Sequence, residues 1–328
     1  MEEMIMNFPN QLEEALKIAS EIKIKVSRDS IDNVIICGMG GSAIGGSFIQ
    51  SFFRLESAVP IFVNRSYDIP AWVNDRTLVI VSSYSGNTEE TVAACHTAIS
   101  AQAKMVILTS GGKLREMAIN HKIDLVTIPP GSPSPRACLG YSIVLMTKVL
   151  IEAKVVNDLA FDSLRSAMQL IKYDQDSIMQ EAMSIAKILH SKTPVIYCPD
   201  HLETSAIRWR QQINENSKLL CWHHVIPEMT HNEIVGWLDQ RDDIAVIVFR
   251  SRDSHKRVVH RIDFLIEALT ELSSHVYEVN AKGNSIIESS IYLIHLGDWV
   301  SLYLAQFKGV DPIEITIIDK LKREMGSI

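Results

Sequence analysis

The sequence predicts an α/β protein made of two domains, each with a mostly parallel sheet flanked by helices. Short apolar runs alternate with longer segments of helical period, which is typical of parallel strands joined by crossover helices. This alternation stops near residue 155 and begins again in the second half of the chain. The chain has 328 residues, and a single core stops growing at about 250 to 300 residues. We therefore expect one domain at residues 1–155 and a second at residues 156–328.

Five runs in the first half have the apolar, β-branched composition of strands that are buried on both faces. These predicted strands are Asn33–Cys37, Pro60–Val63, Thr77–Ser82, Met105–Thr109 and Asp124–Ile128. Helices are expected between them, at Ser42–Phe53, Thr88–Ala101 and Lys113–Asn120. A proline-rich stretch at residues 129–135 excludes regular structure, and Pro135 suits the first turn of a helix over Arg136–Ala153.

The second half repeats this alternation after a helical connector at Asp158–His190. Its predicted strands are Pro194–Cys198, Leu219–His223, Ile244–Phe249 and His275–Val279. Two closing helices are expected at Ser285–Phe307 and Ile313–Arg323, because Gly309 and Pro312 form a signal that stops one helix and starts another. No residue-level repeat relates the halves, so we expect their similarity to be architectural only.

Composition excludes several classes of protein. The net charge is −7, from 32 Lys and Arg against 39 Asp and Glu, and only the tract Arg250–Arg261 is locally basic, so nucleic acid is not an expected partner. No run approaches the ~18 apolar residues that a membrane span requires, and the acidic start lacks the features of a signal peptide. Five cysteines without a CxxC pair favour a reducing compartment, and we expect a cytoplasmic location.

The junction after the first predicted strand is rich in glycine, and Gly38, Gly40 and Ala43 fit the relaxed dinucleotide fingerprint G-x-G-x-x-A. Glycine lets the backbone approach an anion at the start of the next helix, so any phosphate would suit this junction. The second strand ends near Arg65 rather than at the acidic residue of an NAD site. An NADP-dependent reductase therefore stays as one alternative, and tight strand–helix packing without a ligand stays as another.

A second junction crowds polar groups at the start of one helix. They are Ser82, Ser83, Ser85, Asn87 and Thr88. A phosphate monoester needs several short donors and free backbone N–H groups, and this junction supplies both without the lysine of a triphosphate loop. The sequence therefore predicts a small anion site. The alternative is an over-supplied helix cap, since one such residue suffices to cap a helix.

These residues resemble a known family. Ser83–Thr91 is similar to the phosphosugar-binding loop of sugar isomerase (SIS) domains, and other motifs are similar to the bifunctional phosphoglucose/phosphomannose isomerases of archaea and bacteria. Those motifs are Cys37–Ser42, Ser132–Ala137, Trp209–Asn216, His231–Trp237, Gly297-Asp298, Gly309–Pro312 and Leu321-Lys322. The resemblance spans nearly the whole chain and implies two SIS-type three-layer domains.

The resemblance implies reversible isomerisation of glucose 6-phosphate and mannose 6-phosphate to fructose 6-phosphate through a cis-enediolate, with no cofactor and no metal. It assigns the substrate phosphate to Gly41, Ser42, Ser83, Ser85 and Thr88. It makes Glu215 the base that moves a proton between C2 and C1, and Arg136 the group that stabilises the enediolate charge. It gives ring opening to His231 and Lys322, with Lys320 as the other candidate lysine. It also implies a homodimer in which His231 acts across the interface.

The same residues can be judged without the family. Glu215 lies in a polar helical segment, where a partly buried carboxylate could act as a general base, although an isolated glutamate is more often exposed. The ordinary pKa of histidine, near ~6.5, suits proton transfer by His231 at neutral pH, but a lone histidine more often caps or packs. Arg136 and Lys322 could equally be solvated surface charges.

Two further alternatives remain open. The group His223, His224, Glu228, His231 and Glu233 has metal-ligand side chains. However, adjacent histidines on a strand face opposite ways, and no H-E-x-x-H helix is present, so we expect no metal site. A non-catalytic sugar-phosphate sensor would use the same loops to bind a ligand without moving a proton, and it would not need Glu215.

Overall fold

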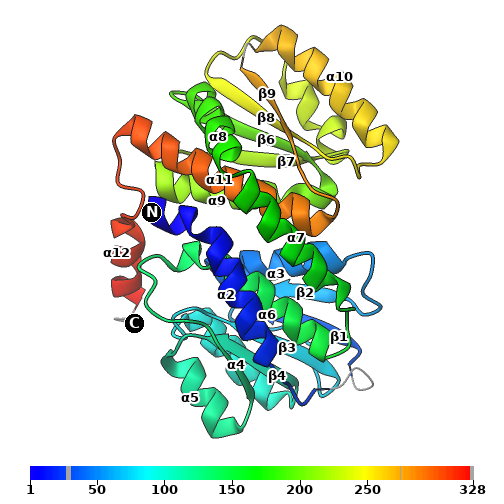
Figure 1. Cartoon of the computed structure of the whole chain (residues 1–328), viewed down its shortest axis with the longest axis vertical. Coiled ribbons are helices and arrows are strands. Elements are labelled where there is room, and N and C mark those ends of the chain that lie inside the picture. Colours follow the sequence, from blue (N-terminus) through cyan, green and yellow to red (C-terminus); the bar gives the residue numbers. More distant parts are fainter. Residues whose placement is uncertain (27–30, 274, 326–328) are drawn as a thin grey trace. The chain divides into compact units, whose positions relative to one another are not determined.

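The computed structural model describes residues 1–26, 31–273 and 275–325. The chain forms two compact units (Figure 1). The N-terminal unit comprises Met6–Leu170 and Ser285–Glu288, and the C-terminal unit comprises Met1–Ile5, Ile171–Asn284 and Ser289–Ile328. The chain passes between the units inside helix α7 (Leu159–Tyr173), and the division predicted at residues 155/156 lies in the turn before this helix.

The N-terminal unit is built on a five-stranded parallel sheet in the order β2-β1-β3-β4-β5. The strands are β1 (Asn33–Cys37), β2 (Ile61–Asn64), β3 (Thr77–Ser82), β4 (Lys104–Thr109) and β5 (Asp124–Thr127). All five predicted strands are confirmed: β1 and β3 have the predicted bounds, β4 and β5 differ by one residue at one end, and β2 is shifted by one residue. Buried parallel strands are the easiest to predict because both faces are apolar.

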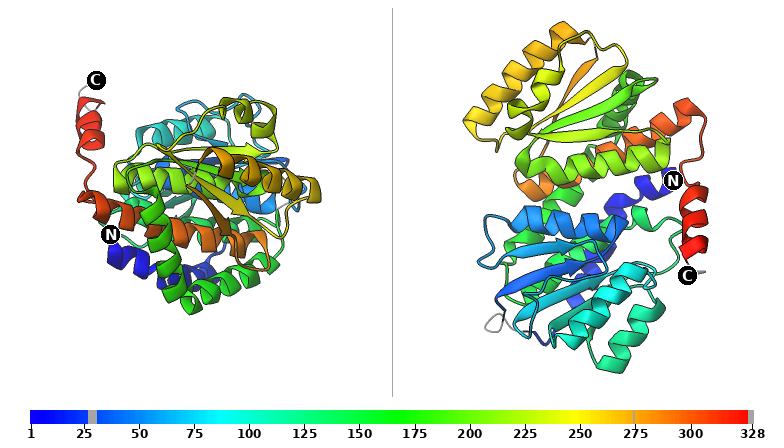
Figure 2. Two further views of the ribbon diagram at one scale, coloured as in Figure 1. Left: turned by 90° about the horizontal axis from the view of Figure 1, so that it is seen from above. Right: turned by 180° about the vertical axis from the view of Figure 1, so that it is seen from behind.

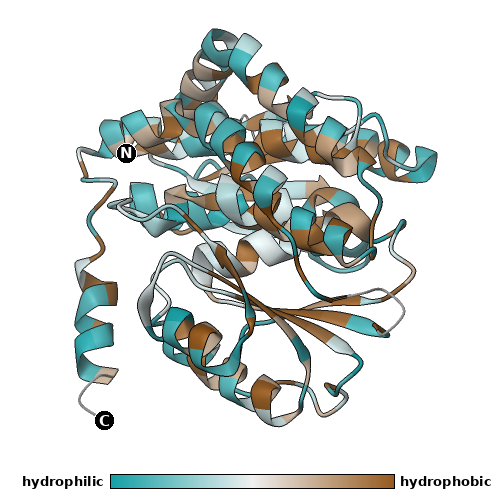
Figure 3. Ribbon diagram, turned by 60° about the horizontal axis from the view of Figure 1, so that its bottom comes forward, coloured by the Kyte–Doolittle hydropathy of each residue, from teal (hydrophilic) through white to brown (hydrophobic). Residues whose placement is uncertain are grey.

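Helices cover both faces of this sheet and give it three layers. α4 (Glu89–Ser100) and α5 (Gly112–His121) pack against the face formed by Ile35, Val79 and Ile107. α3 (Gly40–Phe53) and α6 (Leu139–Glu152) lie on the other face, and α2 (Phe8–Glu21) packs on α6. Figure 3 shows the strands of this sheet mostly in the brown of hydrophobic residues, as burial on two faces requires.

The C-terminal unit repeats this architecture with four parallel strands in the order β7-β6-β8-β9. They are β6 (Thr193–Pro199), β7 (Trp222–Ile226), β8 (Ile244–Arg250) and β9 (Val276–Asn280). α9 (Glu203–Ser217) covers one face and packs on α11 (Ile286–Lys308), while α10 (Lys256–Leu272) and the short 3-10 helix η4 (Glu228–His231) cover the other. α1 (Glu2–Met6), α8 (Gln175–Leu189), η5 (Glu233–Gly236) and α12 (Thr316–Met325) complete the elements used below.

Two predicted elements differ from the structure. The strand predicted at Leu219–His223 is present but displaced by three residues, since β7 spans Trp222–Ile226. The residues after Lys218, which ends α9 with a φ of 53°, form a connecting loop in which Leu220 is 82% exposed. The apolar residues of this loop were therefore mistaken for the start of the strand. The helix predicted over Arg136–Ala153 is divided into a 3-10 turn, Pro135–Ala137, and α6, because the chain changes direction at Cys138.

Two properties of the whole chain bear on its environment. Over the described ranges, every helix is too short or too polar to cross a lipid bilayer. All five cysteines are buried and carry no disulfide bond. Burial raises the pKa of the thiols, to about 12 for Cys37, Cys95 and Cys221, so these side chains behave as small apolar groups.

Candidate active site

Two loops meet at the carboxyl edge of the N-terminal sheet, where β1 and β3 end side by side. Gly38–Ser42 leads from β1 into α3, and Ser83–Thr88 leads from β3 into α4. A Cβ atom on Gly38 would lie 3.0 Å from the Ser82 carbonyl oxygen, so the loops are in close contact. The two following helices lie on opposite faces of the sheet, which is where open α/β sheets bind ligands. We call these two loops, together with Arg136, the β1/β3 corner.

The hydroxyl groups of the second loop are directed at one another and at the loop's own backbone. Ser83 Oγ and Thr88 Oγ1 are 2.9 Å apart. The Gly86 N–H donates to Ser83 Oγ over 3.2 Å, and the Asn87 N–H donates to Ser85 Oγ over 3.3 Å. Ser83 is buried, Thr88 is partly buried and Ser85 is exposed. The loop therefore gathers three hydroxyls around one turn of backbone.

The helices that begin at this corner lack side-chain caps. Thr88 is the N-cap residue of α4, yet no side chain of the cap accepts a hydrogen bond from the first turn. α3 likewise begins after Met39 without a side-chain cap, and Ser42 lies in its first turn. The interpretation of these hydroxyls as a helix cap is therefore not supported. Uncapped N–H groups at two helix starts are suited to an anion.

Two glycines fix the shape of the second loop. Gly86 has a φ of 68°, and a Cβ atom there would lie 1.8 Å from the Gly111 carbonyl oxygen. Gly112 also has a φ of 68°, and its Cβ atom would lie 2.4 Å from the Ser85 carbonyl oxygen. The Asn87 side chain accepts a hydrogen bond from the Lys113 N–H over 3.0 Å. The loops after β3 and β4 are thus packed backbone to backbone, which holds the hydroxyls in place.

Arg136 belongs to the same corner. It lies in the 3-10 turn Pro135–Ala137 and is only 8% exposed, which does not fit the alternative of a solvated surface charge. A Cβ atom on Gly41 would lie 3.4 Å from Arg136 Cα, so the turn packs directly on the start of α3. Gln11 of α2 binds both sides of the turn, donating to the Ala137 carbonyl and accepting from the Gly140 N–H, each over 2.8 Å.

Tyr84 connects the hydroxyl loop to the segment that carries Arg136, and sequence reasoning did not single it out. Its Oη donates to the Pro129 carbonyl over 3.0 Å and accepts from the Ser132 N–H over 2.9 Å. Burial raises the pKa of the Tyr84 phenol, which keeps it a donor at neutral pH. Its partners lie about 45 residues away in the sequence, and no local pattern could have predicted this contact.

The C-terminal unit carries Glu215 on the last turn of α9. The side chain is half-buried, and α9 is fixed to α11 by buried polar pairs on either side of it. Asn216 Nδ2 donates to Ser301 Oγ over 2.9 Å, and Ser217 Oγ donates to the Ser301 carbonyl over 2.7 Å. Lys218 Nζ lies 2.6 Å from the Glu215 carbonyl oxygen and 2.8 Å from that of Asp311. The backbone of this turn is therefore firmly placed.

A buried ion pair is formed by a residue in the first half of α9, and sequence reasoning did not recognise this contact. Arg208 Nη2 lies 3.1 Å from Asp298 Oδ2, with side chains 2% and 9% exposed. Next to it, Trp209 Nε1 donates to the Leu293 carbonyl over 2.7 Å. A Cβ atom on Gly297 would lie 2.3 Å from Trp209 Nε1, so only glycine lets α9 and α11 approach this closely. This explains the Gly297-Asp298 motif as a packing requirement.

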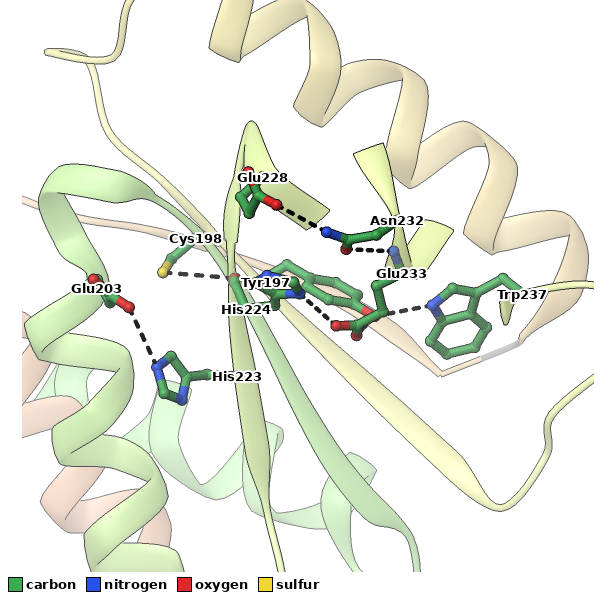
Figure 4. Close-up of polar contacts among 9 residues, drawn as sticks. All are labelled: Tyr197, Cys198, Glu203, His223, His224, Glu228, Asn232, Glu233 and Trp237. Carbon is green, nitrogen blue, oxygen red and sulfur yellow. Dashed lines mark hydrogen bonds and ion pairs between the residues drawn. The ribbon is translucent and has the colours of Figure 1, made fainter. Parts of the chain in front are cut away.

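His231 ends η4 and is exposed. The segment that follows is fastened to the sheet by the Glu233 carboxylate, which accepts from Tyr197 Oη over 2.6 Å and lies 2.5 Å from His224 Nδ1 (Figure 4). Trp237 Nε1 donates to the same Tyr197 Oη over 2.9 Å. Burial and the neighbouring Glu233 raise the pKa of Tyr197, so its phenol stays protonated.

The two adjacent histidines of β7 have different partners on different faces, as the alternation of a strand predicts. His223 Nε2 lies 3.8 Å from Glu203 Oε1 of α9, and this contact lowers the pKa of Glu203. His224 pairs with Glu233 instead (Figure 4). Within the described part of the chain, His, Cys, Asp and Glu side chains form no group of three or more that could hold a metal ion.

The two candidate lysines lie on α12, the last helix described. Figure 2 shows α12 projecting from an extended segment that follows α11. Lys322 Nζ lies 3.8 Å from Asp319 Oδ1, and Lys320 Nζ lies 3.9 Å from Glu324 Oε1. Both lysines are about 70% exposed, and such pairs hold a side chain only weakly. No residue of the helix is buried.

The structure thus gathers the predicted phosphate-binding residues and Arg136 into one corner of the N-terminal unit. It places the predicted acid–base residues in the C-terminal unit, on three separate elements. Glu215 precedes the start of β7, and His231 follows the end of β7. β7 has five residues, which span about 16 Å at ~3.3 Å per residue. Within one C-terminal unit, Glu215 and His231 are therefore attached to the backbone near opposite ends of β7.

Comparisons with known proteins identify relatives in sequence and in fold. The model of the bacterial phospho-glucose isomerase C-terminal SIS domain matches residues 178–325. The chain is 36% identical to a bifunctional phosphoglucose/phosphomannose isomerase of Caldicellulosiruptor bescii, over 100% of this chain and 99% of that one. It is 35% identical to the protein of that name from Aquifex aeolicus, over 89% and 90% of the two chains. The fold matches that of a putative phosphosugar isomerase from Clostridium difficile, with a TM-score of 0.77, 16% identity, and coverage of 95% and 94%.

Proposed function

The chain belongs to the family of bifunctional phosphoglucose/phosphomannose isomerases, and on this premise we propose that it interconverts glucose 6-phosphate, mannose 6-phosphate and fructose 6-phosphate. The relatives that carry this name are similar over their full length, which covers both SIS domains. The β1/β3 corner is the structural observation that carries the proposal. It combines three hydroxyls, two uncapped helix starts and a buried arginine at the edge of one sheet.

The β1/β3 corner binds the substrate phosphate through Gly41, Ser42, Ser83, Ser85 and Thr88. A dianionic phosphate accepts hydrogen bonds from hydroxyls and from the N–H groups of the first helical turns, and it benefits from the positive ends of the helices. The phosphate is remote from the carbons that react. Its binding energy therefore positions the sugar, which lowers the barrier of the chemical step.

Glu215 acts as the base. Its carboxylate removes the proton from C2 of the open-chain aldose, which leaves a cis-enediolate. The same carboxyl group returns the proton to C1, and the hydroxyl proton on O2 passes to O1, which gives the ketose. Negative charge accumulates on the sugar oxygens as the C2 proton leaves. The guanidinium of Arg136 stabilises that charge, and because the side chain is already buried, it needs little reorganisation.

Use of both aldoses follows from the geometry of the intermediate. Glucose and mannose differ only in configuration at C2, and that configuration is lost when C2 becomes planar. Rotation of the enediolate about the bond between C2 and C3 presents either face to Glu215. A site that accepts both substrates must therefore leave space around C2.

His231 and Lys322 open the sugar ring before proton transfer, and we propose that His231 comes from a second copy of the chain. The separation of Glu215 and His231 at opposite ends of β7 supports this arrangement. Ring opening and proton transfer occur at neighbouring atoms of one sugar, so the two groups must converge on it. A symmetric homodimer supplies such a pair twice.

The buried cysteines, which form no disulfide bond, support a cytoplasmic location.

The proposed reaction requires no metal and no cofactor, because a carboxylate base and cationic groups suffice for an enediolate mechanism. Activity should therefore survive exhaustive EDTA treatment. Restoration of a chelated, inactive enzyme by one zinc ion per chain would instead assign the histidines of β7 to a metal.

An NMR time course with the purified protein tests the proposal. Glucose 6-phosphate and mannose 6-phosphate are supplied separately, with no added metal, and fructose 6-phosphate is expected from both. Ligand binding without any product would favour the non-catalytic sensor. Binding and oxidation of NADPH would favour the reductase suggested by the glycine fingerprint.

A further inference from the structure

We propose that Glu233 and Tyr197 are positioning residues for ring opening, because their hydrogen bond fixes the segment that carries His231. This inference rests on the proposed function, since it assumes that His231 opens the sugar ring. It adds the question of how an exposed side chain in an irregular segment is held in a reactive position. Neither Glu233 nor Tyr197 needs to touch the substrate for this role.

The His231 ring is not fixed by contacts of its own. It is exposed, and within the described residues its ring takes part in no hydrogen bond or ion pair. It also lies between two short 3-10 turns, η4 and η5, which lack the repeated hydrogen bonds of an α-helix. The placement of His231 therefore depends on how its backbone neighbours are anchored.

The preceding neighbours are anchored by packing. Met229 is fully buried in the cluster formed by β6, β8 and α10. Thr230 Oγ1 accepts from Arg261 Nη1 of α10 and donates to the Pro227 carbonyl, each over 2.6 Å. These contacts fix the backbone that leads to His231, but they do not fix the backbone that follows it.

The following neighbours are anchored by one carboxylate, as well as by the packing of Ile234 and Trp237 against the core. Asn232 Oδ1 accepts from the Glu233 N–H over 2.6 Å, which sets the turn between η4 and η5. The Glu233 carboxylate then bridges two strands, reaching Tyr197 of β6 and His224 of β7 (Figure 4). Trp237, at the end of the segment, donates to the same Tyr197 oxygen. Tyr197 is thus hydrogen-bonded to both ends of the segment 233–237.

Tyr197 is suited to this role because it is held by the core. Its side chain is 0% exposed and lies in the core between the sheet and α10. Its raised pKa keeps the phenol proton available for Glu233. Loss of this oxygen leaves the Glu233 carboxylate and the Trp237 indole without a shared partner. The segment can then shift, and a displacement of about 1 Å at a reacting group can lower a rate by about 10²-fold.

The experiment isolates ring opening from proton transfer. Opening and reclosing the ring interconverts the α and β anomers of glucose 6-phosphate, so NMR exchange between their C1 signals measures this step alone. The Glu215→Gln background removes isomerisation and leaves anomer exchange measurable. Tyr197→Phe is introduced into this background, and Tyr292→Phe is its matched control. Tyr292 is also fully buried in the C-terminal unit and donates to a glutamate, Glu181, over 2.7 Å.

We expect Tyr197→Phe to lower the catalysed anomer exchange about 10- to 100-fold, and Tyr292→Phe to leave it within about twofold. Binding of 6-phosphogluconate should be the same in both, because the phosphate site is in the other unit. A second series serves if Tyr197→Phe does not fold. Glu233→Ala should lower exchange more than Glu233→Gln, whose amide oxygen still accepts from Tyr197, while Glu267→Ala, at an exposed position of α10, should change nothing.

Equal anomer exchange in the Tyr197→Phe and Tyr292→Phe proteins would overturn the inference, as would equal exchange in the Glu233→Ala and Glu267→Ala proteins. These results differ from failure of the proposed function. In that case the protein with native Glu215 would not form fructose 6-phosphate, whichever tyrosine it carried.

Discussion

The β1/β3 corner of the N-terminal unit and the acid–base residues of the C-terminal unit are built on different principles. The corner consists of glycines, hydroxyls and helix starts at the ends of strands that are buried on both faces. The acid–base residues occupy the last turn of α9, a 3-10 turn and a helix without buried residues. One region is thus preformed by backbone packing, and the other depends on individual side-chain contacts.

The difference follows from the chemistry assigned to each region. Anchoring a phosphate requires many donors in a constant arrangement, and a rigid backbone provides them at little entropic cost on binding. Proton transfer and ring opening require side chains that change protonation state, so these groups need access to substrate and solvent. Such residues cannot be buried in a core, and a few longer-range bonds must fix them instead.

Loss of the base should produce the largest effect. Glu215→Gln keeps the shape of the side chain but removes its basicity, and we expect turnover to fall at least ~10²- to 10⁴-fold while 6-phosphogluconate binds as before. Steady-state kinetics and calorimetry measure the two quantities. Glu267→Gln, at an exposed position of α10, is the matched control. Near-normal turnover in the Glu215 variant would show that another residue is the base.

Damage to the backbone of the corner should act on binding first. In Gly86→Ala, the new Cβ atom would meet the Gly111 carbonyl, and the φ of 68° is itself unfavourable for alanine. We expect phosphate-bearing ligands to lose at least about tenfold in affinity, equivalent to ~1.4 kcal/mol. Gly111→Ala is the control, since its Cβ atom would meet nothing within 4 Å. If both variants bound 6-phosphogluconate normally, the corner would not be the phosphate site.

Tyr84→Phe should separate binding from placement of Arg136. It removes the two hydrogen bonds to Pro129 and Ser132 but leaves the hydroxyl loop intact. A net loss of about 1 kcal/mol would lower kcat about fivefold with little change in ligand affinity. Tyr173→Phe, at a 91% exposed tyrosine, is the control. A change in affinity alone would show that Tyr84 serves the phosphate and not the arginine.

Acid stability should also differ between the two units. His295 of the C-terminal unit is fully buried, and burial lowers its pKa to about 3. The unfolded chain takes up a proton at this residue below about pH 6.5, whereas the folded chain does not until about pH 3. Stability is therefore lost as pH falls through this window, by at most ~1.4 kcal/mol per pH unit.

Thermal unfolding at pH 7 and at pH 5 tests this difference. His295→Gln should show a smaller fall in melting temperature between the two values than the native sequence does. His96→Gln serves as the control in the N-terminal unit, because His96 is exposed. An unchanged pH dependence in His295→Gln would mean that other groups dominate acid unfolding.

Much of the N-terminal unit could be predicted from sequence because its information is local. Buried parallel strands are continuous apolar runs, and the loops that follow them display their glycines and hydroxyls in order. The C-terminal unit was predicted less accurately. The apolar loop residues after Lys218 were mistaken for part of a strand. The contacts of Tyr197 with Glu233 and of Arg208 with Asp298 join residues that are 36 and 90 positions apart. Contacts at such separations leave no periodic signal.

We propose that Glu215 and His231 of different chains act on one sugar, and a mixed oligomer tests this proposal directly. Chains carrying Glu215→Gln and chains carrying His231→Ala are produced together with different affinity tags, and the species that carries both tags is isolated. If the two residues act across the interface of a symmetric dimer, each mixed dimer retains one intact site, and it should show about half of the native activity, although each parent is inactive. If both residues act within one chain, every site in the mixed dimer lacks one of them, and an inactive mixed dimer would contradict the claim.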